Sequence, residues 1–171
     1  MKEYQLKKLL ENREEQEQKI KEYLAEGSLT KQERIKEEIQ GHLQKAEHNL
    51  AFTQDTVKQG YSDWAVVGCY YTSYHIALAL LLNKGFSSKN HDATLCVLIR
   101  HYYKKELSAE DLHLLNQTFL DNQDILFYVE TKQEREKASY STNTHFPSQL
   151  VEGLRIKTIL FVNKCKEILN K

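Results

Sequence analysis

Proline, glycine and cysteine are scarce in this chain of 171 residues. One proline and six glycines provide few turn signals, which argues against a sheet-rich fold and favours long helices. The three cysteines, Cys69, Cys96 and Cys165, are widely spaced and odd in number, which is typical of reduced, buried thiols in an intracellular protein. C-x-x-C and H-x-x-x-H spacings are also missing from the sequence, so we predict neither a metal site nor a cofactor.

The chain also has no net charge. The 24 Lys and Arg residues balance the 24 Asp and Glu residues, which excludes a broad electrostatic attraction to nucleic acid or anionic lipid. Any such attraction must come from a local site. The longest apolar run, around residues 76–82, is far shorter than a bilayer span, and the first residues lack the apolar segment of a signal peptide. We therefore expect a cytoplasmic protein with no membrane contact.

The charged and aromatic residues divide the chain unevenly. The first 50 residues hold only two aromatic residues, Tyr4 and Tyr23, and are rich in Glu, Lys and Gln. The core is therefore expected mainly after residue 50. We predict an all-α protein with a charged N-terminal helical extension over residues 1–28 and a bundle of four or five helices over residues 29–171.

Turn and capping residues place the predicted helices. They run over residues 2–26, 31–59, 64–84, 91–103, 109–138 and 148–169. The residues that mark their ends are Thr30 with Glu33, Asp63, Ser108 with Asp111, and Ser148 at the starts, and Gly27, Gly60 and Gly85 at the stops. Residues 87–90 are expected to form a polar loop.

The predicted helix over residues 64–84 is apolar on nearly every side, which places it at the centre of the bundle. Tyr70 and Tyr74 share one side of this helix, as do Tyr71 and His75, because each pair is four residues apart. One interpretation is a surface on which nucleotide bases stack. The structural alternative is core packing in which each polar tip finds a hydrogen-bond partner.

Four segments resemble a known family. They are DWAVVGCYYTSYH over residues 63–75, KGF over 84–86, SKNH over 88–91 and REKASY over 135–140. In their order and spacing these segments are similar to the HEPN superfamily, above all to its small stand-alone archaeal and bacterial members. The resemblance covers roughly residues 40–170 and does not extend to the first 30.

The resemblance implies a helical bundle that forms a homodimer and acts as a metal-independent ribonuclease. It also implies a toxin partnered by a small nucleotidyltransferase antitoxin of the MNT type. Active members carry an arginine followed four to six residues later by a histidine. Arg135 fits the arginine position, but Tyr140 stands where the histidine would be, and His145 is the next histidine along the chain. The implied catalytic residues are therefore Arg135, Tyr140 and His145.

Two alternatives remain open beside this ribonuclease. The first is a non-catalytic HEPN module that binds nucleotide or RNA, or scaffolds a nucleotidyltransferase partner. The second is a purely structural bundle in which Arg135 is a solvated residue of a charged helix face. Because some toxins of the family receive AMP on a tyrosine beside the motif, Tyr140 is also a candidate acceptor.

Two further places in the sequence are candidates for RNA or nucleotide binding, together with Tyr71 and His75. Lys89 and His91 stand at a helix start, where a phosphate can be held, although His91 can equally order the loop by an interhelical hydrogen bond. Arg100 opens a short basic and aromatic stretch that suits single-stranded RNA. The alternative for Arg100 is a solvated helix end whose basic residues complement the helix dipole.

Overall fold

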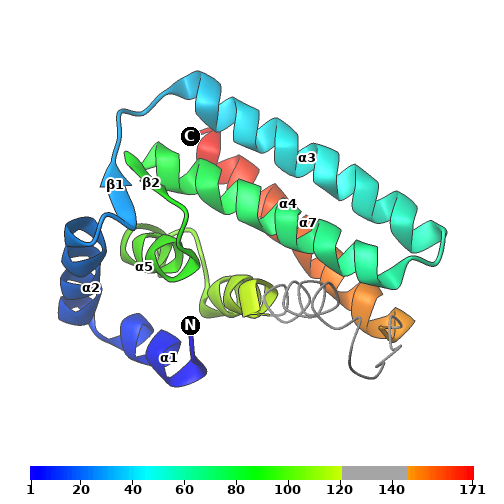
Figure 1. Ribbon diagram of the computed structural model, residues 1–171, viewed down its shortest axis with the longest axis horizontal. Coiled ribbons are helices and arrows are strands. Elements are labelled where there is room, and N and C mark those ends of the chain that lie inside the picture. Colours follow the sequence, from blue (N-terminus) through cyan, green and yellow to red (C-terminus); the bar gives the residue numbers. More distant parts are fainter. Residues whose placement is uncertain (121–145) are drawn as a thin grey trace, which may run out of the picture.

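The computed structural model describes residues 1–120 and 146–171, and it confirms the all-α prediction (Figure 1). The labelled helices are α1 (Glu3–Glu11), α2 (Arg13–Ala25), α3 (Lys36–Lys58), α4 (Ser62–Asn83), α5 (His91–Tyr102) and α7 (Ser148–Leu169). A further helix occupies residues 109–120. Two short strands, β1 (Leu29–Lys31) and β2 (Phe86–Ser88), complete the described elements.

Helix α4 lies at the centre, as its apolar sequence predicts. It forms an antiparallel pair with α3 and runs alongside α7 in the same direction (Figure 1). Its inward side is fully buried, with Ile76, Ala77 and Leu80 all at 0% exposure in the main hydrophobic cluster. All three cysteines are buried and unpaired. The protein therefore has one main core built around a single helix.

Length and composition alone would allow α4 to cross a membrane. It is the one helix in the described ranges, 1–120 and 146–171, that meets this test, and 72% of its most apolar window is buried inside the fold. The buried core helix of a folded domain passes the same test. Helix α4 is such a core helix.

The N-terminal segment differs from its prediction. A single helix is expected over residues 2–26, but the helix breaks at Asn12, whose side chain accepts a hydrogen bond from the backbone N–H of Glu15 at 3.1 Å. Asparagine is a favoured N-cap, so it starts a second helix there. The break lets α1 bury Leu6, Leu9 and Leu10 in the main cluster while α2 lies against α5.

The predicted helix start at Thr30 and the predicted loop at residues 87–90 are also wrong in part. Residues 29–31 instead pair antiparallel with residues 86–88, with Leu29 opposite Ser88, and α3 begins only at Lys36. Beside this pairing, Gly85 has a φ of +76° and its carbonyl accepts from the N–H of Gln32 at 2.9 Å. The partner strand is distant in the sequence, so local capping signals could not reveal it.

The remaining helix ends are close to their predictions. The Ser108 and Asp111 cap is confirmed, because the Ser108 N–H donates to the Asp111 carboxylate at 2.8 Å. Helix α4 begins one residue before the predicted cap Asp63, and α7 begins at Ser148, with Pro147 in the cap position.

Candidate functional site

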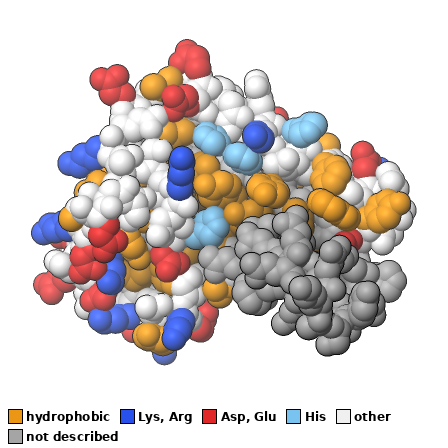
Figure 2. All heavy atoms as spheres, viewed as in Figure 1, with side chains coloured by type: hydrophobic (Ala, Val, Ile, Leu, Met, Phe, Trp, Pro, Cys, Tyr) orange, Lys and Arg blue, Asp and Glu red, His pale blue; other side chains and the backbone are white. Residues whose placement is uncertain are grey.

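The candidate site starts from the side of α4 that faces solvent. Six residues lie along this side of the helix, and we call them the α4 stripe: Trp64, Val67, Tyr71, Tyr74, His75 and Leu78. None of the six is charged, and together they span about 21 Å of helix. Trp64 is 56% exposed and Tyr71 is 40% exposed. Figure 2 shows histidine and hydrophobic side chains side by side on the face formed by α3 and α4.

Two tyrosines connect this helix to α5. The hydroxyl of Tyr70 lies 3.1 Å from Nε2 of His91, and the Tyr70 ring is stacked parallel to that of Tyr74 at 5.8 Å between centroids. The other side of His91 stacks on Phe119, with ring centroids 4.3 Å apart. His91 thus joins α4, α5 and the helix over residues 109–120, as its interhelical alternative predicts.

Burial keeps this cluster uncharged. Desolvation raises the pKa of Tyr70 to about 12 and lowers the pKa of His91 below its usual value. At neutral pH a phenol therefore meets a neutral imidazole, and the Tyr70 O–H can donate to His91 Nε2. In that tautomer the His91 proton is on Nδ1, which is buried and has no hydrogen-bond partner among residues 1–120 and 146–171.

A second imidazole contact joins α4 to α3. Nδ1 of His75 lies 2.9 Å from Nδ1 of His42, and the ring centroids are 5.1 Å apart. Burial and the neighbouring His42 lower the pKa of His75 to about 4, and burial also lowers the pKa of His42. Sequence reasoning did not assign His42 to the site. Its signal lies in the helix pair itself, because His42 and His75 stand 18 residues before and 15 residues after the turn at Gly60.

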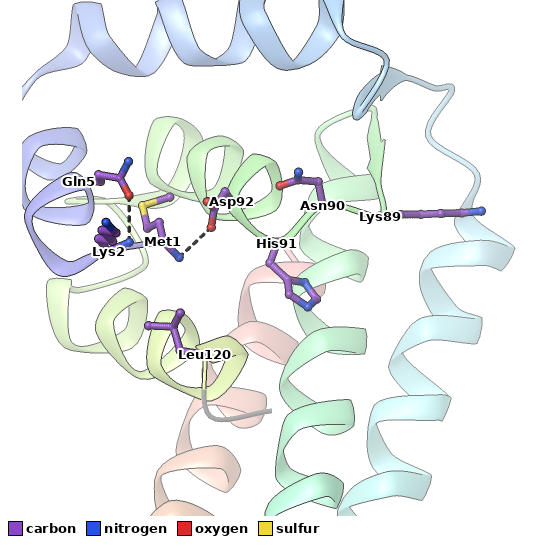
Figure 3. Close-up of a pocket in the computed structure, with 8 residues that line it drawn as sticks. All are labelled: Met1, Lys2, Gln5, Lys89, Asn90, His91, Asp92 and Leu120. Atoms are coloured by element: carbon purple, nitrogen blue, oxygen red, sulfur yellow. Dashed lines mark hydrogen bonds and ion pairs between the residues drawn. The ribbon is translucent and has the colours of Figure 1, made fainter. Parts of the chain in front are cut away.

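A polar pocket of about 480 Å³ adjoins His91 at the start of α5 (Figure 3). The Met1 amino group is paired with Asp92 at 2.8 Å, and the Asn90 side chain caps α5 by accepting from the Ala93 N–H at 3.0 Å. The Lys89 side chain points away from Met1 and Asp92 in Figure 3. The cap and the Asp92 carboxylate already occupy this helix end, so phosphate binding there stays a prediction.

The predicted binding residues fall into two groups. Tyr71, His75 and His91 lie together, because the ring of Tyr74 is 5.6 Å from that of His75 and 5.3 Å from that of His91, and the ring of Tyr71 is 4.9 Å from that of Tyr70. Arg100 lies about half a helical rotation around α5 from His91. Its guanidinium is bound to the carboxylate of Glu17 at 2.9 Å.

The predicted catalytic residues Arg135, Tyr140 and His145 lie outside the described residues. In the part of the chain that the structure does describe, no group of three or more histidine, cysteine or acidic side chains is arranged to hold a metal ion. What the structure provides near the start of α5 is a neutral surface of phenol and imidazole groups. Such a surface can stack on bases and exchange hydrogen bonds with them.

Comparison with known proteins identifies the class. A model of the HEPN domain family matches residues 39–144. This match covers more than half of the chain, so the protein belongs to the HEPN domain family.

Two proteins of the archaeon Methanocaldococcus jannaschii are similar to it. The one named "Putative toxin MJ0142" is 26% identical over 137 residues, which make up 80% of this chain and 84% of that protein. The one named "Putative toxin MJ0605" is 25% identical over 137 residues, which make up 80% of this chain and 92% of that protein.

Proposed function

We propose that this protein is an RNA-directed toxin that cleaves RNA without a metal ion and acts as a homodimer. The observation that carries the proposal is the HEPN match, whose span of residues 39–144 includes Arg135 and Tyr140. The two similar proteins named as toxins support the same function. A nucleotidyltransferase of the MNT type is the partner we propose, with Tyr140 as the residue that would receive AMP.

The proposed chemistry follows from the residue types. Cleavage of RNA requires a group that helps to deprotonate the 2′-hydroxyl or to protonate the leaving oxygen, and a fixed cation that stabilises the charged phosphate. Arg135 supplies the cation. Because a phenol with a pKa near 10 is a weak base at neutral pH, we assign the proton transfer to the imidazole of His145, with Tyr140 as a hydrogen-bond donor to the phosphate. His91 was the other candidate, but its Nε2 is bound to Tyr70 and its Nδ1 is buried.

The neutral face of α4 suits the bases of the RNA. Tyr71 is exposed enough to stack on a base, and His75 and His91 flank Tyr74 beside it. Stacking on aromatic rings contributes about 1–3 kcal/mol per base and requires no charge. Lys89 is exposed and lies two residues before His91 in the sequence, so it is the predicted phosphate contact that is nearest to His91 along the chain.

The test is cleavage of a labelled RNA by the purified protein in excess EDTA. We expect cleavage by the parent and a loss of about 100-fold or more in Arg135→Ala, because one lost stabilising contact to a charged transition state costs that much. Arg13→Ala is the matched control, since Arg13 is an exposed arginine of α2 that pairs only loosely with Glu17 at 3.6 Å. Equal cleavage by the parent and Arg135→Ala would show that the site assignment is wrong.

We assign the dimer contact to the N-terminal end of α4 around Trp64. Trp64 and Phe52 of α3 are exposed by 56% and 45%, and Tyr71, farther along α4, stays free for RNA. A two-fold contact here would bury the apolar side chains of Trp64 and Phe52 in both copies. The exposed apolar residues of α7, Ile156 and Leu160, share their side of the helix with Lys157, so self-contact there is less favourable.

Sedimentation of two charge variants tests this contact. Trp64→Glu should shift the protein to the monomer, whereas Leu160→Glu, at a side chain exposed by 62%, should leave the dimer intact. The reverse outcome would move the contact to α7. A parent that sediments as a monomer at all concentrations would remove the dimer from the proposal.

A non-catalytic module that binds RNA or nucleotide is the second candidate, and the tyrosine at position 140 favours it. It predicts that the parent binds RNA without cleaving it. In that case Tyr71→Ala should weaken RNA binding by about 5-fold to 100-fold, which follows from the free energy of one stacking contact. Leu160→Ala is the control, and binding can be measured by fluorescence anisotropy.

A further inference from the structure

His42 and His75 meet at the seam between α3 and α4. Their Nδ1 atoms are 2.9 Å apart although the residues are 33 positions apart in the sequence. Both rings are only partly buried, so small solutes can reach them from solvent. We infer that this histidine pair is a binding site for a divalent transition metal ion of the class that prefers nitrogen ligands, namely Cu²⁺, Ni²⁺ or Zn²⁺.

The distance between the two nitrogens is one that such an ion can bridge. An imidazole nitrogen binds these metals at about 2.0–2.1 Å, and two such bonds at a right angle place their nitrogens about 2.9 Å apart. This is the separation that the structure shows. Right angles between neighbouring ligands belong to square-planar and octahedral coordination, which Cu²⁺ and Ni²⁺ adopt. Tetrahedral Zn²⁺ requires the nitrogens to move apart by a few tenths of an ångström.

Protons compete only weakly with a metal ion for these two imidazole rings. A histidine must be neutral to bind a metal, and burial lowers the pKa of both rings, that of His75 to about 4. Without a metal, one Nδ1–H donates to the other Nδ1. With a metal, both rings carry their proton on Nε2 and both Nδ1 lone pairs point to the ion, so the rings lose no proton in total.

Two charged residues near the pair have opposite effects on the binding of a cation. Glu38 lies one turn before His42 on α3 and raises the pKa of that ring, so it attracts a cation, whereas Lys45 lowers the pKa of both rings and repels one. The protein provides two ligands, and water completes the coordination. We therefore expect weaker binding than at sites with three or four protein ligands.

The inference does not depend on RNA cleavage. An ion held by one residue from α3 and one from α4 fastens the helix pair, so it should raise the melting temperature as its concentration exceeds the dissociation constant. A bound ion would also make His75 unavailable for contact with RNA. No local motif indicates this site, because metal-binding motifs are recognised from ligands that are close in the chain.

Titration with Cu²⁺ alone, in a buffer that does not bind metals, tests the inference. Electron paramagnetic resonance should show one bound Cu²⁺ per chain with hyperfine splitting from two imidazole nitrogens. Either His42→Ala or His75→Ala should weaken this binding by at least about 10-fold, because one of two ligands is lost. His48→Ala is the matched control, since His48 is an exposed histidine of the same helix, and it should bind as the parent does.

A second measurement guards against variants that fold poorly. Ni²⁺ should raise the melting temperature of the parent and of His48→Ala, and should leave that of His75→Gln unchanged, whatever the starting stability of each protein. Cu²⁺ binding as strong as that of the parent in both His42→Ala and His75→Ala would overturn the inference. So would a parent that binds Cu²⁺ no more tightly than these two variants.

Discussion

The two sides of α4 have similar sequences but different surroundings. The inward side, with Ile76, Ala77 and Leu80, is fully buried in the main cluster. The outward side, the α4 stripe, is equally free of charge, yet Trp64 and Tyr71 remain 56% and 40% exposed. Packing explains the apolar residues of the first side. It does not explain the exposed Trp64 and Tyr71 of the second side, and this difference is the reason to look for function along the stripe.

The largest effect is expected on the buried side. Leu80→Ala removes a side chain that is 0% exposed and leaves a cavity in the main cluster. We expect a loss of about 2–5 kcal/mol in the free energy of unfolding, measured by urea denaturation. A loss below about 1 kcal/mol would mean that the core around α4 is looser than its burial indicates.

Gly68→Ala tests how closely α3 approaches α4. A Cβ atom at Gly68 would lie 2.2 Å from Oγ1 of Thr53, so the helices must shift to accept it. We expect a loss of about 1–3 kcal/mol in unfolding free energy, with part of it restored in the double variant that also carries Thr53→Ala. Gly41→Ala, at a helical position of α3 with open space around it, is the control and should be neutral or stabilising.

The histidine pair should make stability depend on pH. A solvated imidazole titrates near 6.5, whereas burial lowers the pKa of His75 to about 4 in the folded protein, so the unfolded chain binds more protons between these values. Stability should therefore decrease as the pH falls from about 6.5 toward 4.

The measurement is the urea midpoint at a series of pH values in EDTA. His75→Gln should flatten the dependence in that range, whereas His48→Gln should keep the slope of the parent. An equal slope in the parent and in His75→Gln would assign the dependence to other groups.

The smallest effect is expected on the exposed side. Trp64→Ala should change the free energy of unfolding by no more than about 0.5 kcal/mol when the measurement is made at concentrations where the protein is a monomer. A larger loss would show that Trp64 supports the fold, and the contrast between the two sides of α4 would weaken. A small loss would sharpen it.

Much of the fold could be predicted from local signals. Gly60 and Gly85 end α3 and α4 as expected, and the Ser108 cap begins the helix over residues 109–120. The errors have two causes. At Asn12 the side chain caps a new helix, although the sequence pattern predicted one continuous helix. At Thr30 the chain pairs with a strand far along the sequence in place of starting a helix.

The candidate site was predictable only in part. Tyr71 and His75 were selected because their four-residue spacing places them on one side of a helix, and His91 because it stands at a helix start. His42 and Phe119 join them only through tertiary contacts, to His75 and His91 respectively, which no local pattern contains. Arg100 was selected for its basic neighbours, and its pairing with Glu17 of the N-terminal segment could not be seen in advance.

The short β1 and β2 pairing has a consequence for the order of folding. It joins Leu29 to Ser88 and so closes a loop that contains the whole of α3 and α4. Helices α3 and α4 are joined by a short turn. Contacts between them therefore cost little loop entropy and should form early. The strands can then meet at little further cost. We expect the pairing of β1 and β2 to form late, and the docking of α1 and α2 onto α5 to follow it.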